Sequence, residues 1–178
     1  PHTGTGRQQG ALFPIDDQRG MRAISLPGLE LMAHHKRRLR IPVTTMSGAQ
    51  GLDVWVPWLG AYVVNKASTC LRRPHVGGTN DKRFKDLLYL RDLAAAGPEV
   101  FEHIAGDLRN MRHGQVSSEL RSAANTLRLA LSDGDGITQA ALLLRERDRE
   151  RQLSQAGAVA DLRGHIGDLV SLLRSASA

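Results

Sequence analysis

The chain has 178 residues, which is enough for one domain with a good core, with or without a helical appendage. Its single cysteine, Cys70, excludes an intramolecular disulfide and any zinc site built from several cysteines. No apolar run approaches the ~20 residues that cross a bilayer, so we expect a cytoplasmic protein. The net charge of +6 and an isoelectric point near 10.2 favour polyanionic partners such as RNA or nucleotides.

The first third of the chain predicts strands with one short helix among them. Apolar stretches at 11–15 and 21–26 flank a polar turn and are expected to form two strands. Residues 28–38 have the pattern of a short helix that ends in a basic run. Residues 39–45 and 52–57 alternate apolar and polar side chains and are expected to form two further strands.

The densest basic run of the sequence is His34-His35-Lys36-Arg37-Arg38. Such a run has two interpretations of equal weight. It is either a solvated face beside a loop or a patch that contacts phosphates through Lys36, Arg37 and Arg38. The second interpretation predicts weak, salt-sensitive binding to RNA.

Asp53 stands out on the strand expected at 52–57. Successive side chains of a strand point to opposite faces, so Asp53 shares one face with Trp55. The aliphatic side chains of the same strand occupy the other face, which we assign to the core. Asp53 therefore points either to solvent or into a cleft.

Lys66 lies in an apolar helical stretch, where a lysine is rarely placed without a partner or a task. The next helix is expected to begin at Asp81 and carries Asp86. At ~1.5 Å per residue, Lys66 and Asp86 both lie roughly 8–11 Å from the connecting loop. If the two helices fold back on each other, the lysine and the aspartate face one partly open cleft and come into direct or water-mediated contact.

A strand ending in Val56-Pro57, an apolar helix with Lys66, a loop and then Lys85-Asp86 follow one another over residues 11–97. This order resembles the distal half of nucleotidyltransferase-fold toxins from AbiE-like abortive-infection and toxin–antitoxin systems. The family's first motif, Gly-Ser followed by Asp-x-Asp, is not found. The sequence also begins with Pro1 rather than Met, so we expect a fragment or a processed form.

The resemblance implies an enzyme that transfers a nucleoside monophosphate from an NTP to RNA, such as tRNA, or to protein. It implies that Lys66 contacts the triphosphate and that Asp86 orients Lys66 or the acceptor. Asp53 would be the candidate ligand for Mg²⁺, provided that other carboxylates complete the site. An antitoxin-like protein is the expected partner of such a toxin.

Five cations bracket the loop between the two helices, and a nucleotidyltransferase would use them to meet a triphosphate or an RNA backbone. They are Arg72, Arg73, Lys82, Arg83 and Lys85. Two alternatives stay open. The chain could be a non-catalytic protein of the same fold that binds RNA or an antitoxin-like partner, or a helical adaptor in which Lys66 and Asp86 form only a structural ion pair.

The remainder of the chain predicts helices, with a turn at Asp133–Gly136 and a last helix near Val159–Arg174. The whole is expected to be an α/β (α+β) protein with a small mixed or antiparallel sheet of nucleotidyltransferase type, followed by a C-terminal helical bundle. We expect four to five helices after the sheet. The predicted parts are the partial sheet at 1–57, the helical part of the site at 58–112 and the helical region at 113–178.

Overall fold

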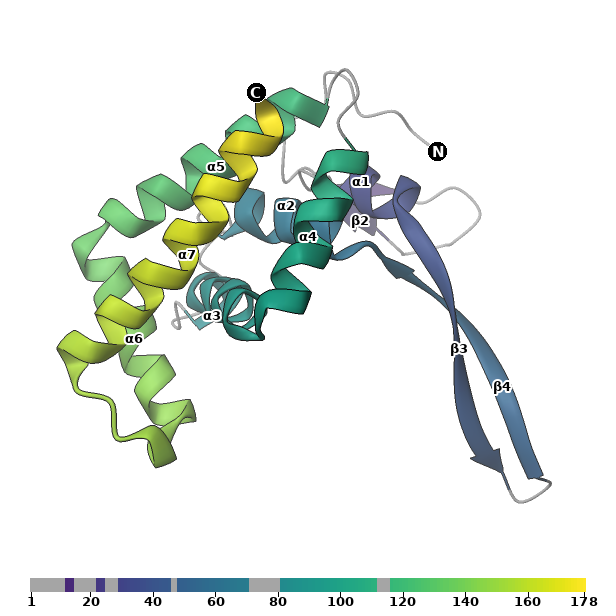
Figure 1. Ribbon diagram of the computed structural model, residues 1–178, viewed down its shortest axis with the longest axis horizontal. Coiled ribbons are helices and arrows are strands. Elements are labelled where there is room, and N and C mark those ends of the chain that lie inside the picture. Colours follow the sequence, from purple (N-terminus) through teal and green to yellow (C-terminus); the bar gives the residue numbers. More distant parts are fainter. Residues whose placement is uncertain (1–11, 15–21, 25–28, 46–47, 71–80, 112–115) are drawn as a thin grey trace.

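The computed structural model describes residues 12–14, 22–24, 29–45, 48–70, 81–111 and 116–178 (Figure 1). Within these ranges the chain forms four strands, seven α-helices and one short 3₁₀ helix. The strands are β1 (Leu12–Pro14), β2 (Arg22–Ile24), β3 (Lys36–Thr45) and β4 (Gly48–Pro57). The helices are α1 (Leu29–His34), α2 (Leu59–Thr69), α3 (Asp81–Ala95), α4 (Pro98–Asn110), α5 (Val116–Ser132), α6 (Gly134–Arg147), η1 (Arg149–Arg151) and α7 (Gln155–Ser177).

The order of strands first and helices afterwards is confirmed. Of the two predicted alternatives, antiparallel pairing is confirmed, but the described strands form two separate pairs, β1–β2 and β3–β4, rather than one sheet. Parallel pairing needs a crossover of about a dozen residues or more, whereas only two residues separate β3 from β4. Among the described residues six α-helices follow the strands, one more than expected.

Strands β3 and β4, of ten residues each, form an antiparallel hairpin, here called the arm, which projects away from the helices (Figure 1). The assignment of the aliphatic face of β4 to the core is wrong, because Leu52 is 55% exposed. On the neighbouring strand Leu39 and Ile41 are exposed as well. The alternating pattern therefore predicted the strands correctly but not their surroundings.

Helix α1 ends at His34, so the three cations that the sequence placed at the end of this helix, Lys36, Arg37 and Arg38, lie instead at the start of β3. Pairing explains the change, because Lys36 stands opposite Pro57 at the base of the arm. The same junction is closed by a hydrogen bond of 2.8 Å from the Trp58 amide to the His35 carbonyl. The rings of His35 and Trp58 lie 5.1 Å apart.

The helices pack around one aliphatic core. Helix α7 contacts α3, α4, α5 and α6 and brings a stripe at helical spacing into the interior. The stripe consists of Leu162, Ile166, Leu169 and Leu173, each almost fully buried. No helix in the described part of the chain is both long and apolar enough to cross a membrane.

Two helix boundaries differ from the sequence prediction. Asp133 does not lie in a free turn but caps α6, since its side chain accepts a hydrogen bond of 3.0 Å from the Gly136 amide. Helix α7 is longer than expected and begins after Ser154, whose hydroxyl accepts from the Gly157 amide at 3.0 Å. These local caps outweigh the low helix propensity of the glycines that follow them.

Helix α2 is held against α4 at its first turn. Trp58 precedes the helix without a side-chain cap, and the Gly60 amide donates instead to the Asp107 carboxylate at 3.1 Å. A carboxylate at this position satisfies an end amide of the helix and matches the positive end of its dipole. Gly60 permits the contact, because a Cβ there would lie 2.8 Å from Asp107 Cβ and 3.1 Å from the Leu108 nitrogen.

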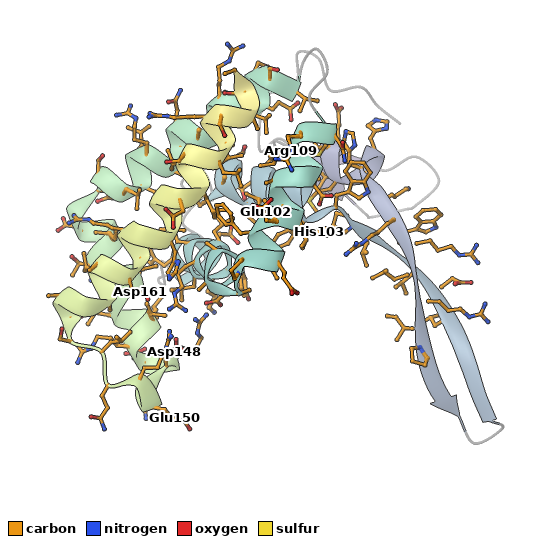
Figure 2. The ribbon with its side chains drawn as sticks, in the orientation of Figure 1. Glu102, His103, Arg109, Asp148, Glu150 and Asp161 are labelled. Atoms are coloured by element: carbon orange, nitrogen blue, oxygen red, sulfur yellow. The ribbon has the colours of Figure 1, made fainter. Side chains whose placement is uncertain are left out.

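Helix α3 is tied to the C-terminal helices by an ion network. Arg91 is buried and donates two hydrogen bonds to Asp161 of α7, of 2.6 and 2.9 Å. Arg147 of α6 donates two hydrogen bonds of 2.7 Å to Asp92 of α3. Asp148, labelled with Asp161 in Figure 2, also accepts from Arg147 at 3.1 Å. The orientation of the helix that carries Asp86 therefore depends on residues far along the chain.

Candidate functional site

Lys66 of α2 and Asp86 of α3 meet where the two helices pack. The Lys66 Nζ atom donates to Asp86 Oδ1 at 2.8 Å, so the predicted contact between these side chains is confirmed. The Asp86 side chain is 3% exposed, whereas the Lys66 side chain keeps 15% of its surface accessible. The carboxylate thus lies inside the protein and fixes an ammonium group that solvent still reaches.

Two tyrosine rings flank this ammonium group, and the sequence prediction missed both. The Nζ atom of Lys66 lies 5.6 Å from the centre of the Tyr62 ring and 5.7 Å from that of Tyr89. Both distances suit a cation–π contact. Helical spacing was the available signal, because Tyr62 precedes Lys66 by four residues and Tyr89 follows Asp86 by three.

The other cations assigned to this site are only partly covered by the structure. Lys85 is exposed, beside Asp86 in sequence. Arg72 and Arg73 lie outside the described residues, as do the side chains of Lys82 and Arg83. A role for these five cations in binding phosphate stays a prediction.

Asp53 lies on the arm, where its carboxylate accepts a hydrogen bond from the guanidinium of Arg38. Across the described ranges, no three histidine, cysteine, aspartate or glutamate side chains come together in a way that could hold a metal ion. Mg²⁺ requires several oxygen ligands, so the described residues do not fit a magnesium site. Asp53 as a metal ligand therefore finds no support in the geometry.

The basic run divides between the two faces of the arm. Lys36 and Arg38 lie on one face of β3, and Arg40, which the sequence prediction did not single out, continues that row. Arg37 belongs to the other face and its Nη1 atom lies 3.3 Å from Nε2 of His103. Figure 2 shows His103 on the side of α4 that faces the arm. Strand alternation thus places Lys36 and Arg38 on one side of the arm and Arg37 on the other.

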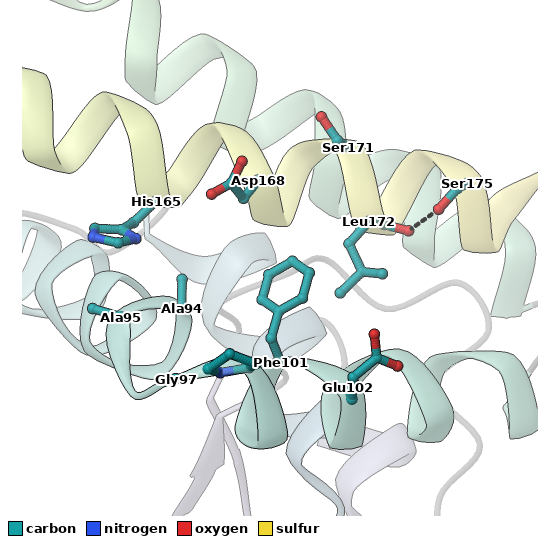
Figure 3. A pocket seen from close by; sticks show the side chains of 11 residues that line it. Ala94, Ala95, Gly97, Phe101, Glu102, His165, Asp168, Ser171, Leu172 and Ser175 are labelled. Atoms are coloured by element: carbon teal, nitrogen blue, oxygen red, sulfur yellow. Dashed lines mark hydrogen bonds between the residues drawn. The ribbon is translucent and has the colours of Figure 1, made fainter.

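An open pocket of about 760 Å³ lies between α4 and α7 (Figure 3). Phe101 and Leu172 give it an apolar floor, while Glu102 and Asp168 place carboxylates along its sides. His165 lies at one end. Neither Lys66 nor Asp86 lines this pocket, so it is separate from the Lys66–Asp86 site, and its two carboxylates make it unsuitable for a triphosphate.

Comparison with known proteins gives no relative. No family model matches the sequence, and neither a curated protein nor a solved structure matches it significantly.

Proposed function

We propose that this chain is a nucleotidyltransferase-like protein of the bacterial toxin type, in which Lys66 receives the triphosphate of an NTP. The observation that carries the proposal is the 2.8 Å contact between Lys66 and Asp86. These two residues stand at the two motif positions of the sequence resemblance, and they come from two different helices. The proposed acceptor of the nucleoside monophosphate is RNA or protein, and an antitoxin-like protein is the proposed partner.

The contact leaves the lysine able to bind a phosphate. An ammonium group has three N–H donors, and one of them is used by Asp86. The two others can donate to phosphate oxygens, for which lysine acts as a compact positive charge. Asp86 lies deep between the helices and so restricts the positions that the ammonium group can take. A fixed cation stabilises charge on a leaving pyrophosphate better than a mobile one.

Tyr89 gives the site a second surface. Tyr89 is 48% exposed, and its ring lies beside the Lys66 ammonium group. A nucleobase or ribose placed on this ring would keep the phosphates within reach of the lysine. Transfer of the nucleotide additionally requires metal-binding carboxylates, which the described residues do not bring together.

Substitution of Lys66 tests the proposal. We expect Lys66→Gln to weaken NTP binding at least tenfold, because it removes the charge and keeps most of the side chain. The measurement is equilibrium dialysis of a labelled NTP in the presence of magnesium, using the longest natural form of the protein. Arg121→Ala, which removes an exposed charge on α5, is the matched control and should bind the NTP as the wild type does.

The same variants distinguish the enzyme from a helical adaptor with a structural ion pair. Hydrogen bonds to charged groups contribute about 1.5–3 kcal/mol, so thermal melting of Lys66→Gln should show a loss within that range. A similar loss of stability together with undetectable NTP binding by the wild type would favour the adaptor. NTP binding that is unchanged in Lys66→Gln would remove the lysine from the proposed site.

A further inference from the structure

One face of the arm carries a row of cations with an aromatic ring among them. Lys36, Arg38 and Arg40 occupy alternate positions of β3 and therefore point to the same side. The antiparallel register places Trp55 opposite Arg38 and Asp53 opposite Arg40, on that same side. We call these five residues the cationic face.

The residues of this face are exposed to solvent, and their net charge is positive. The Trp55 side chain is 64% exposed, and the Lys36 Nζ atom lies 5.4 Å from the centre of its ring. Three cations stand against the single carboxylate of Asp53, which pairs with Arg38. At about 3.4 Å per residue, the row from Lys36 to Arg40 extends for about 14 Å.

The opposite face of the arm has a different character. It presents the aliphatic side chains of β3 and β4, and its one cation, Arg37, is directed to His103 at the base of the arm. Gly51 lies on the same side of the arm as the cationic face and leaves space for Arg40, because a Cβ at Gly51 would overlap the guanidinium group. Most of the positive charge of the arm thus lies on one side, in the half of the arm that is nearer to the helices.

We propose that the cationic face binds a single-stranded polynucleotide, with its phosphates along Lys36, Arg38 and Arg40 and a base stacked on Trp55. Proteins that bind single strands combine cations that follow the backbone with aromatic rings on which bases stack. A duplex keeps its bases stacked and would leave the ring of Trp55 without a partner. This proposal rests on the arm alone and is independent of the site at Lys66.

The row of cations is tested by a triple substitution, Lys36→Ala with Arg38→Ala and Arg40→Ala, against the single substitution Arg37→Ala. Binding of a labelled 20-nucleotide single strand is measured over a range of salt concentrations, with RNA and DNA strands and with a duplex of the same sequence. We expect the wild type to prefer the single strands. We expect the triple variant to lose about 2 from the slope of log affinity against log salt, since each phosphate contact contributes about 0.7.

Arg37→Ala should keep most of the slope of log affinity against log salt, because the charge that it removes lies on the opposite face of the arm. Equal slopes for the wild type and the triple variant, in proteins with the same circular dichroism spectrum, would overturn the proposal. So would a wild type that prefers the duplex, or one that binds no strand at low salt.

Trp55 is tested separately. We expect Trp55→Ala to lower affinity for the single strand about fivefold or more without changing the salt slope, because stacking of one base contributes at least about 1 kcal/mol. Leu52→Ala, which shortens an exposed side chain on the opposite face, is the control and should bind as the wild type does. Equal affinities for Trp55→Ala and the wild type would show that no base stacks on this ring.

Discussion

Asp53 has two possible roles, and they predict different effects of the substitution Asp53→Asn. As a metal ligand it would support activity, and Asp53→Asn would reduce it. As the partner of Arg38 it neutralises part of the cationic face, so Asp53→Asn should raise the affinity for a single-stranded oligonucleotide. The change in stability should stay within about 0–1 kcal/mol, because this ion pair is exposed. Oligonucleotide binding at two salt concentrations and thermal melting measure both effects, with Asp135→Asn on α6 as the control. A lower affinity in Asp53→Asn would contradict the assignment of this residue to the cationic face.

At the scale of residues, the sequence was most informative where the geometry is local. Lys66 and Asp86 could be predicted as partners, because helical rise places both at the same distance from their loop. The side of the arm on which Arg37 and Arg40 lie could not be predicted in this way. It depends on whether position 36 continues a helix or begins a strand, and pairing with Pro57, 21 residues away, decides that. The tyrosines beside Lys66 followed a helical spacing that a search for charged residues overlooks.

Two helical glycines, Gly60 and Gly164, differ in the space around their Cβ positions. We expect Gly60→Ala to destabilise the protein by about 1–3 kcal/mol, because the new methyl group would meet Asp107 and the backbone of α4. Gly164→Ala on α7 should instead be neutral or stabilise by up to about 1 kcal/mol, since no atom lies within 4 Å of its Cβ position. Urea denaturation of the two variants and the wild type measures the difference. Equal stabilities of the two variants would show that α2 and α4 can separate at no cost.

The arm shows why a strand pattern is not enough to place an element. Alternation of apolar and polar side chains is typical of a strand with one covered face. Leu39, Ile41 and Leu52 satisfy that pattern, yet none of them is buried in the described structure. Periodicity records the two sides of a strand and carries no information about what lies against them. In the helices the same kind of pattern succeeded, because each helix has neighbours on its apolar side.

The ion pair between Arg91 of α3 and Asp161 of α7 makes the stability of the folded protein depend on pH. The guanidinium of Arg91 holds the pKa of Asp161 below its usual range. The folded protein therefore binds fewer protons here than the unfolded chain, and the stabilisation is present above pH 3.8 and lost as the pH falls through the lowered pKa. We expect Asp161→Asn to cost about 1.5–3 kcal/mol at pH 7, and this cost should shrink toward pH 3.

Asp168→Asn is the control for this prediction, because it makes the same change on an exposed position of the same helix. It should alter the free energy of unfolding by less than about 0.5 kcal/mol at either pH. The measurement is urea denaturation of the three proteins from pH 7 to pH 3. A cost of Asp161→Asn that stays constant over this range would mean that the contact with Arg91 does not depend on the carboxylate charge.

The position of α7 also has a consequence in time. This helix packs at the centre of the aliphatic core and holds α3 through Arg91, yet residues 155–177 are synthesised after all the helices that it contacts. Before they emerge from the ribosome, the apolar sides of α3, α5 and α6 have no complete partner. At about 5–20 residues per second, these sides stay uncovered for a second or more during synthesis. Until α7 covers them, these apolar sides are the surfaces of the nascent chain most prone to aggregation.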